Sequence, residues 1–306
     1  MKGILEKDIT ISGRMIKLAK LQAEGFEFID NPEDFVAKMK SEKVKADIFT
    51  FPQKLPETTP NYSYYMEWDN VAAIPIRTYE YWWTKQIDKQ TRKKVRKAKE
   101  KGVEISIVNF DDEFVRGIAG IYNESPIRQG KRFWHYGKNL ETIKKENATY
   151  LDRSCFLGAY YNGELIGFIK LVFDKDFAST MQVISKIGHR DKAPTNALIA
   201  KAVEVCEQKK MPYLVYAKFF YRGKRKDSLS EFKHHNGFIK IDLPRYYIPM
   251  TSKGKIALTF HLHRDIKDNL PEKLVYFLTD MRNRLNKIKY GKETNGKLDS
   301  RQIFNA

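Results

Sequence analysis

The sequence lacks cysteine pairs, long apolar runs and the common catalytic signatures. Its two cysteines, Cys155 and Cys206, cannot supply a disulfide framework or a four-cysteine zinc site. No window approaches 18 consecutive apolar residues, which argues against a membrane-spanning helix, and charged residues follow the first methionine too closely for a signal peptide. The HExxH, GxSxG, Walker and dinucleotide-glycine patterns are also missing. These absences predict a soluble, cytoplasmic protein that uses no metal.

What the sequence does contain is a full complement of core-forming residues and a clustered positive charge. Hydrophobic residues make up 42% of the 306 positions and aromatic residues 13%, so a wholly disordered chain is excluded. Of the net charge of +18, residues 84–101 contribute +7, residues 218–227 contribute +4 and residues 251–306 contribute +6. Such clusters attract the phosphates of nucleic acid, anionic membranes or a phosphorylated cofactor. A solvated helix face is the ordinary alternative.

Hydrophobic periodicity predicts an α/β domain with a mainly antiparallel sheet. The expected helices cover residues 84–101, from 111 onward, 198–206 and 229–234, and the expected strands cover 103–108, 155–161, 164–173, 180–187, 212–219, 238–242 and 246–249. The pair Asn162-Gly163 is a favoured two-residue hairpin turn, and Gly237 is a typical helix terminator. Cys155 and Cys206 fall in the middle of elements, so we expect both to be buried and inert.

We expect three regions along the chain. Residues 1–83 form a nearly neutral N-terminal region with strands at 9–11, 46–51 and 71–76, which is either a small domain or a degenerate half-domain. Residues 84–250 form the α/β domain. Residues 251–306 form a basic extension that is helical over 264–290.

The strand–loop–helix at residues 181–206 is the best candidate for a cofactor site. A loop that enters a helix presents unpaired backbone N–H groups and the positive end of the helix dipole, which suit a pyrophosphate. Pro194 is favoured in the first helical turn, and Thr195 or Asn196 could cap the helix or contact phosphate. The candidate contacts are Lys186, Ile187, Gly188, His189, Arg190, Lys192, Ala193, Pro194, Thr195, Asn196 and Ala197. An ordinary surface loop with solvated basic side chains is the alternative.

The order of elements and three short stretches resemble a known superfamily. The stretches are Thr91–Val103, Ala193–Ile199 and Phe232–Phe238. Residues 68–250 are similar to the acyl-CoA N-acyltransferase (GNAT) superfamily, and especially to FemAB-like proteins and to GNAT-like proteins linked with bacterial surface polysaccharides. The resemblance implies acetyl-CoA as co-substrate and no metal. The glycine-rich pyrophosphate loop of the superfamily is missing here, so aminoacyl-tRNA stays open as the donor.

Residues 124–138 are rich in groups that suit an acceptor. Aromatic faces stack on a sugar ring, and a guanidinium forms paired hydrogen bonds to phosphate or carboxylate. The candidate acceptor contacts are Arg128, Gln129, Arg132, Trp134 and Tyr136. In the alternative interpretation the segment is structural. Phe133 and Trp134 then fill the core, and Arg128 pairs with Glu124.

Acyl transfer to an amine needs a base for the ammonium proton, donors for the oxyanion and an acid for the leaving group. Glu124 and His135 are the candidate bases, because imidazole titrates near neutral pH and burial can raise the pKa of a carboxyl. The candidate acids or charge stabilisers are Tyr216, Tyr221 and Lys233. The resemblance implies that backbone N–H groups near residues 185–187 stabilise the oxyanion.

The preferred functional hypothesis is an N-acyltransferase that transfers acetyl from acetyl-CoA to an amino sugar or sugar nucleotide in surface-polysaccharide synthesis. The expected partners are this amine acceptor and, for the basic segments, the anionic inner face of the membrane. A FemAB-like transferase that uses aminoacyl-tRNA is the first alternative. A non-catalytic nucleic-acid-binding protein is the second, and steep salt dependence of binding would mark either one.

Overall fold

The computed structural model describes residues 9–221, 228–264 and a few positions between 274 and 288. The expected C-terminal helix and most of the basic segment 218–227 therefore lie largely outside the described residues. The helices are α1 (Pro32–Ser41), α2 (Tyr79–Tyr81), the π-helical η2 (Trp82–Gln86), α3 (Lys89–Glu100), α4 (Asp112–Tyr122), α5 (Leu140–Asn147), α6 (Pro194–Gln208), α7 (Ser228–His235) and α8 (Ser252–Thr259), with 3₁₀ turns η3 (Leu151–Arg153) and η4 (Ile187–Lys192). None of the described helices is long and apolar enough to cross a bilayer.

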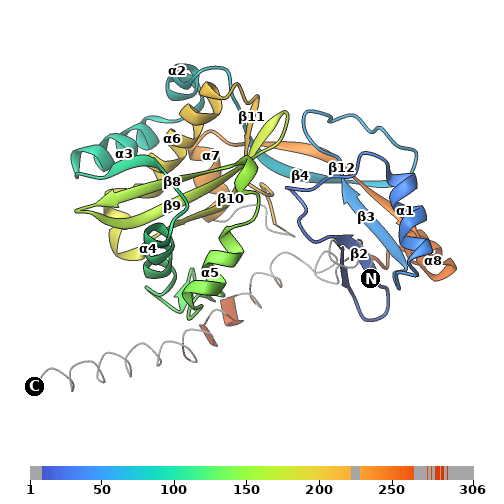
Figure 1. The fold of residues 1–306 in the computed structure, drawn as a ribbon. Helices are drawn as coiled ribbons and strands as arrows, with labels where there is room; N and C mark the ends of the chain where they lie inside the picture. Colours follow the sequence, from blue (N-terminus) through green and yellow to red (C-terminus); the bar gives the residue numbers. More distant parts are fainter. Residues whose placement is uncertain are drawn as a thin grey trace, which may run out of the picture.

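Within the described residues, ten strands form one continuous sheet (Figure 1). In spatial order they are β1 (Ile9–Ser12), β2 (Leu18–Leu21), β3 (Ile48–Pro52), β12 (Ile239–Pro249), β4 (Tyr65–Pro75), β11 (Tyr213–Val215), β10 (Phe177–Ser185), β9 (Glu164–Phe173), β8 (Ser154–Tyr161) and β5 (Glu104–Val108). The pairs β2–β3 and β10–β11 are parallel and the other pairs are antiparallel. A small ribbon joins β6 (Ile127–Arg128) to β7 (Lys131–Arg132). The predicted α/β class with a mainly antiparallel sheet is confirmed.

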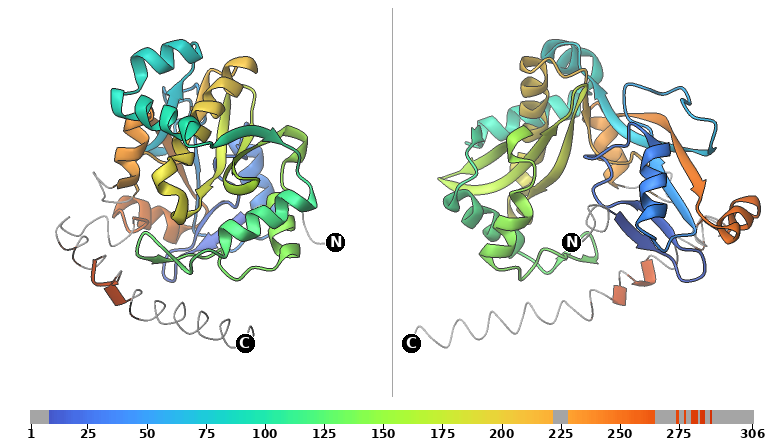
Figure 2. Two further views of the ribbon diagram at one scale, coloured as in Figure 1. Left: turned by 90° about the vertical axis from the view of Figure 1, so that its left-hand side faces the viewer. Right: turned by 45° about the vertical axis from the view of Figure 1, so that its right-hand side comes forward.

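Helices cover both faces of the β8–β10 part of the sheet (Figures 1 and 2). On one face α4 packs against β9, and Phe114 and Ile118 meet Phe168 there. On the other face α6 packs against β8, β9 and β10, burying Leu198 and Ile199. Because both faces are covered, β9 is buried along nearly its whole length. The predicted meander of β8, β9 and β10 therefore forms the centre of the core.

The N-terminal residues extend this sheet. The long strands β4 and β12 pair along nine positions and link the β8–β11 region to β3, against which α1 packs (Figure 1). Val36 and Met39 of α1 meet Phe49 and Phe51 there. Strands from residues 1–83 thus join the same sheet as later strands, and the division at residue 83 stays a prediction.

Several boundaries differ from the sequence expectation. The basic helix begins at Lys89, because Asp88 accepts a hydrogen bond from the N–H of Thr91 and acts as its N-cap. Ile239–Pro249 form one strand, since Pro244 lies opposite Trp68 of β4 and its carbonyl accepts from the N–H of Gln53, so it does not break the ladder. The predicted turn at Asn162-Gly163 is confirmed. The predicted end of α7 before Gly237 is also confirmed, and Gly237 has a φ of +87°.

Candidate functional site

The candidate site begins where β10 separates from β11. The two strands pair only from Phe177 to Ser179 in the described part of the chain, although β10 continues to Ser185. The register of β10 against β9 skips Met181, which marks a β-bulge. Bulges re-aim the strand and are common beside active sites. After Val215 the chain turns toward β4, where the N–H of Tyr216 donates to the carbonyl of Ala72 at 2.8 Å. A V-shaped opening in the backbone hydrogen-bond ladder follows.

The carboxylate of Glu124 accepts hydrogen bonds from backbone N–H groups at the start of the turn between β10 and α6. Its Oε2 accepts from the N–H of Ile187 at 2.6 Å, and its Oε1 accepts from the N–H of Gly188 at 2.8 Å. The N–H of Lys186 donates to the carbonyl of Ile166 at 2.7 Å. Of the backbone N–H groups near residues 185–187 that the sequence suggested for an oxyanion, those of Lys186 and Ile187 are therefore already engaged. Both oxygens of Glu124 accept hydrogen bonds here, and its role as general base stays a prediction.

The side chain of Arg128 binds Glu124 and holds it in position. Its guanidinium lies 3.1 Å from Oε2 of Glu124 and donates to the carbonyls of Ser185 at 2.7 Å and Ile121 at 2.8 Å. It also lies over the ring of Phe133, 4.6 Å from the centroid. This half-buried cation holds the end of α4 to the end of β10. The structural interpretation of Arg128 is the one that the geometry supports.

The aromatic residues of the 124–138 segment divide between interior and surface. The ring of His135 is buried against Tyr122, with centroids 4.2 Å apart, whereas Trp134 is 68% exposed. The alternative in which Trp134 fills the core is wrong, because most of the side chain is exposed; Nζ of Lys138 lies 3.4 Å from the centroid of its ring. Gln129 and Arg132 lie on the exposed β6–β7 ribbon, and Tyr136 is half buried.

Burial decides the protonation of His135. Its pKa is lowered to about 4, by burial first and by the nearby charges of Lys138 and Arg128 second, against the opposing charge of Glu146. The imidazole is therefore neutral at pH 7. Its stacking partner Tyr122 hydrogen-bonds Gln182 just past the β10 bulge, and burial raises the pKa of Tyr122 to about 12. Neither Tyr122 nor Gln182 was singled out in the sequence, where no local pattern marks them.

The helix α6 begins without a side-chain cap. Pro194 occupies its first turn as predicted, behind Ala193 in the left-handed region with φ of +53°. Thr195 bonds Ser185 through its hydroxyl at 2.8 Å. Asn196 is buried and donates to the side chain of Asn236 at 3.0 Å. The helix cap suggested for Thr195 or Asn196 is therefore absent, and their side chains contact β10 and Asn236 after α7. The suggested contact with phosphate stays a prediction.

The second cluster of predicted catalytic residues lies past the end of β11. Lys233 is fully buried; its Nζ donates to the carbonyl of Lys218 at 2.6 Å and lies 4.5 Å from the ring centroid of Tyr216 and 5.1 Å from that of Tyr221. Burial raises the pKa of Tyr216, so its phenol keeps its proton at neutral pH. The structure thus brings Tyr216, Tyr221 and Lys233 together, apart from Glu124, Arg128 and His135 on the α4 side.

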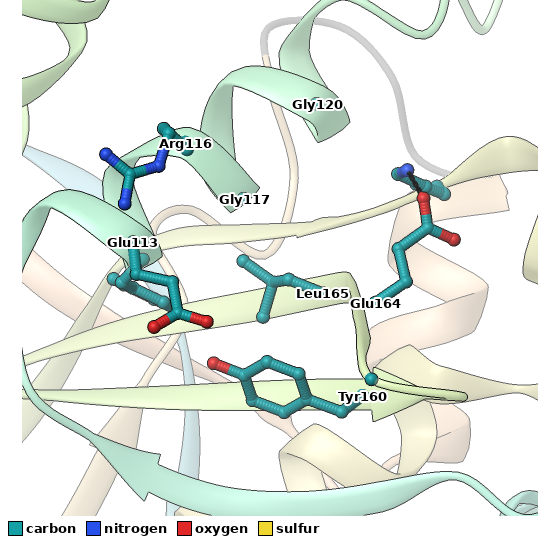
Figure 3. A pocket seen from close by; sticks show the side chains of 10 residues that line it. Glu113, Arg116, Gly117, Gly120, Tyr160, Glu164 and Leu165 are labelled. Carbon is teal, nitrogen blue, oxygen red and sulfur yellow. Dashed lines mark hydrogen bonds and ion pairs between the residues drawn. The ribbon is translucent and has the colours of Figure 1, made fainter.

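The basic residues of the turn face acidic partners. Lys186 and His189 pair with Glu164, and Lys192 contacts Asp191, which is also bonded by Lys101. Arg190 is exposed. The Lys186–Glu164 pair borders a cavity of about 300 Å³ between α4 and the β8–β9 hairpin. In Figure 3 the hydroxyl of Tyr160 points toward the carboxylate of Glu113, and both lie below Leu165 in this view.

The described residues hold no group of three or more histidine, cysteine, aspartate or glutamate side chains that could bind a metal ion. Cys206 is fully buried, and burial raises the pKa of its thiol to about 12. Burial also raises the pKa of Cys155, which is partly buried in β8. We expected both cysteines to be buried: this is confirmed for Cys206 and wrong for Cys155, which is only partly buried because it lies near the start of β8. That both thiols are inert stays a prediction.

Comparison with known proteins establishes the fold. No protein-family model and no curated protein matches the chain. Among solved structures, the C-terminal domain of a protein provisionally named lysylphosphatidylglycerol synthetase from Agrobacterium fabrum is 12% identical, with a TM-score of 0.55 over 82% of this chain and 83% of that one. L-PGS from Bacillus licheniformis is also 12% identical, with a TM-score of 0.52 over 83% and 85%.

A tandem GNAT protein from the clavulanic acid biosynthesis pathway is 9% identical, with a TM-score of 0.44 over 76% of this chain and 75% of that one. At these identities the likeness concerns the fold alone. The two likenesses with TM-scores above 0.5 show that this chain shares its fold with the two synthetase structures. In this chain the bulged β10 separates from the parallel β11 and is followed by α6.

Proposed function

We propose that the chain is an N-acyltransferase whose donor lies in the opening between β10 and β11. The observation that carries this proposal is the separation of β10 from β11 after Ser179, together with the bulge at Met181. Beyond this point the backbone N–H and C=O groups of β10 are not paired with β11. They form an open strand edge that could hydrogen-bond the donor that carries the acyl group. The fold shared with the two synthetase structures supports the same reaction class.

In this reaction an amine nitrogen attacks the acyl carbon, the new C–N bond forms and the bond to the donor's sulfur or oxygen breaks. The ammonium proton passes to solvent water, and the leaving group takes up a proton from a side-chain acid. Tyr216 is the proton donor in this proposal, because a phenol with a raised pKa still holds its proton when a thiolate or alkoxide departs. His135, which lies within the 124–138 segment, acts in this proposal as a neutral hydrogen-bonding group and not as a cation.

The first candidate donor is acetyl-CoA, and the first candidate acceptor is an amino sugar or sugar nucleotide. Exposed Trp134 offers an aromatic face near the α4–α5 connection for such a ring. The second candidate donor is aminoacyl-tRNA. It is favoured by the exposed lysines of α3, a helix that packs beside α6 (Figure 1). Lys93, Lys94 and Lys97 are exposed on that helix and present a basic surface to a phosphate chain.

The experiment is a transfer assay with purified protein, in which radiolabelled acetyl-CoA or aminoacyl-tRNA is offered with a panel of amino sugars and other amines. Tyr216→Phe should lower turnover by about 10- to 100-fold, whereas Tyr213→Phe on the same strand segment should not. Absence of transfer from both donors to every amine in the panel would overturn the proposal. Equal turnover of Tyr216→Phe and the unmodified protein would remove Tyr216 from the mechanism.

Measuring RNA binding at several salt concentrations distinguishes the two candidate donors. If α3 binds RNA, replacing Lys93, Lys94 and Lys97 by Gln should reduce the slope of log affinity against log salt by about 2 to 3. Replacing the exposed Lys38, Lys40 and Lys43 near α1 by Gln changes the net charge equally and serves as the control. Binding to vesicles of anionic lipid is measured in the same way, because a membrane surface would also bind the lysines of α3.

A further inference from the structure

The turn between β10 and α6 contains an anion site that the protein itself occupies. Two consecutive backbone N–H groups, of Ile187 and Gly188, point at the two oxygens of a single carboxylate, that of Glu124. Successive N–H groups that converge in this way form an anion-binding concavity. A phosphate oxygen would take the same position and the same two hydrogen bonds. The donors are therefore present, but an internal carboxylate already uses them.

Glu124 is held in this position from a second side. Oε2 accepts from Arg128 at 3.1 Å, and Arg128 is itself fixed by the carbonyls of Ser185 and Ile121. The side chains of Glu124 and Arg128 are only 22% and 15% exposed. To leave the turn, the carboxylate would have to give up its hydrogen bonds to Ile187, Gly188 and Arg128. The half-buried guanidinium of Arg128 would then have no carboxylate partner at this position. Such a carboxylate stays in place.

The occupied anion site at Ile187 and Gly188 affects which acyl donor can bind. A pyrophosphate that approached Ile187 and Gly188 would bring like charge to within contact of the Glu124 carboxylate, which opposes binding strongly where water is partly excluded. Among the basic side chains nearby, Lys186 and His189 already pair with Glu164, and Lys192 contacts Asp191. Arg190 is exposed, so water screens its charge and it offsets only part of this repulsion. An acyl ester on the 3′ end of an RNA brings no pyrophosphate to this turn.

We propose that Glu124 is a specificity-determining residue that fills the anion site at Ile187 and Gly188 and excludes donors that place a pyrophosphate there. This inference rests on the proposed acyl transfer, and it assigns the donor to the class of aminoacyl esters of RNA rather than to CoA thioesters. It also explains why the glycine-rich pyrophosphate loop can be missing. Glu124 acts here by occupying donors and takes no part in proton transfer.

The test measures binding of inorganic pyrophosphate and of CoA by calorimetry at near-physiological salt, without any turnover. The proteins are the unmodified chain, Glu124→Gln, Glu124→Ala and the control Glu164→Gln. The control also removes one carboxylate beside the turn, and it releases Lys186 as the Glu124 variants release Arg128, so it matches the change in charge. Amide resonances of Ile187 and Gly188 in ¹⁵N-labelled protein report whether the ligand reaches the turn.

We expect the unmodified chain to bind both ligands at least about tenfold more weakly than Glu124→Ala, with Glu124→Gln in between. The two amide resonances should shift in the Glu124 variants alone. Micromolar binding of CoA by the unmodified chain, with shifts at Ile187 and Gly188, would overturn the proposal even if neither variant folds. An equal gain in Glu164→Gln would overturn it as well, because the effect would then be one of charge.

This binding test is independent of the transfer assay. If neither donor supports transfer but the Glu124 variants gain pyrophosphate binding, the proposed function fails while the occupied anion site stands. If acetyl transfer from acetyl-CoA proceeds in the unmodified chain, the assignment of the donor fails while the proposed acyl transfer stands.

Discussion

The side-chain amide of Asn196 donates a hydrogen bond to Oδ1 of Asn236 at 3.0 Å, which joins the first turn of α6 to the residue that follows α7. Asn236 is fully buried and donates in turn to the carbonyl of Phe232 at 2.7 Å. Its own carbonyl accepts from Nε1 of Trp82 at 3.0 Å. A pair of asparagines therefore ties three segments together beside the candidate site.

Removing one member of this pair should destabilise the fold. Asn196→Ala leaves Oδ1 of the buried Asn236 without its donor, so we expect the free energy of unfolding to fall by about 1–3 kcal/mol. Urea denaturation followed by circular dichroism measures this change. Exposed Gln90→Ala on α3 is the control, with an expected effect within about 0.5 kcal/mol. A double variant Asn196→Ala/Asn236→Ala should lose less than the sum of the two single variants.

His135 should make stability depend on pH below neutrality. Its folded-state pKa of about 4 lies below the usual value of 6.5, so between these values the unfolded chain binds more protons than the folded one. Stability from this group is therefore complete above pH 6.5 and is lost as the pH falls toward 4, by up to about 3 kcal/mol. Urea denaturation at pH 7.0, 5.5 and 4.5 should show a shallower loss in His135→Gln. Replacement of exposed His234 by Gln should leave the profile as it is, and parallel profiles for all three proteins would contradict the prediction.

Arg245 should be among the most sensitive positions of the sheet. It lies 2.8 Å from Glu24 and 2.8 Å from Asp69, and these three side chains are no more than 17% exposed. Burial alone would raise the pKa of Asp69, but the charges of Arg245 and Lys218 lower it. Arg245→Met removes the cation that Glu24 and Asp69 share and leaves Asp69 with Lys218. We expect a loss of about 3–5 kcal/mol.

A matched comparison comes from the exposed pair Lys144–Asp112, where Lys144→Met should cost less than about 1 kcal/mol. Adding Glu24→Gln and Asp69→Asn to Arg245→Met should restore part of the loss, because the uncompensated charges are then removed. A loss in Arg245→Met no larger than in Lys144→Met would show that the cluster contributes little.

Two glycines with the same backbone conformation should differ in their tolerance of alanine. Gly237 and Gly163 have φ of +87° and +78°, so alanine costs about 1 kcal/mol at each. At Gly237 a Cβ would also lie 2.9 Å from Nε1 of Trp82, whereas nothing lies within 4 Å at Gly163. We therefore expect Gly237→Ala to cost about 1–3 kcal/mol more than Gly163→Ala. Thermal unfolding of the two variants, side by side, decides this.

Much of the local structure was predictable because it depends on neighbouring residues. The alternation of β8 and β9 and the Asn162-Gly163 turn between them predicted the hairpin. Pro194 predicted the start of α6, and Gly237 predicted the end of α7. The boundary at Lys89 was missed because a π-helical turn over Trp82–Gln86 precedes it, and such a turn has no distinct periodicity.

The candidate site itself depends on contacts that are distant in sequence. Glu124 reaches Ile187 and Gly188 across 63 and 64 positions, so the sequence could mark the loop as an anion site and Glu124 as a polar group without showing that one fills the other. The bulge at Met181 and the contact of Tyr122 with Gln182 likewise arise from the register of β10 against β9 and the packing of α4.

The sequence by itself determined the class of fold, the order of its elements and the basic character of α3, because periodicity, turn residues and charge are local properties. Tertiary structure decided which polar groups remain available for chemistry. Burial set the protonation of His135, long-range hydrogen bonds engaged the amides of the β10–α6 turn, and pairing of β4 with β12 carried the sheet into the N-terminal residues. Each of these depends on which segments pack together, and spacing along the chain does not encode that directly.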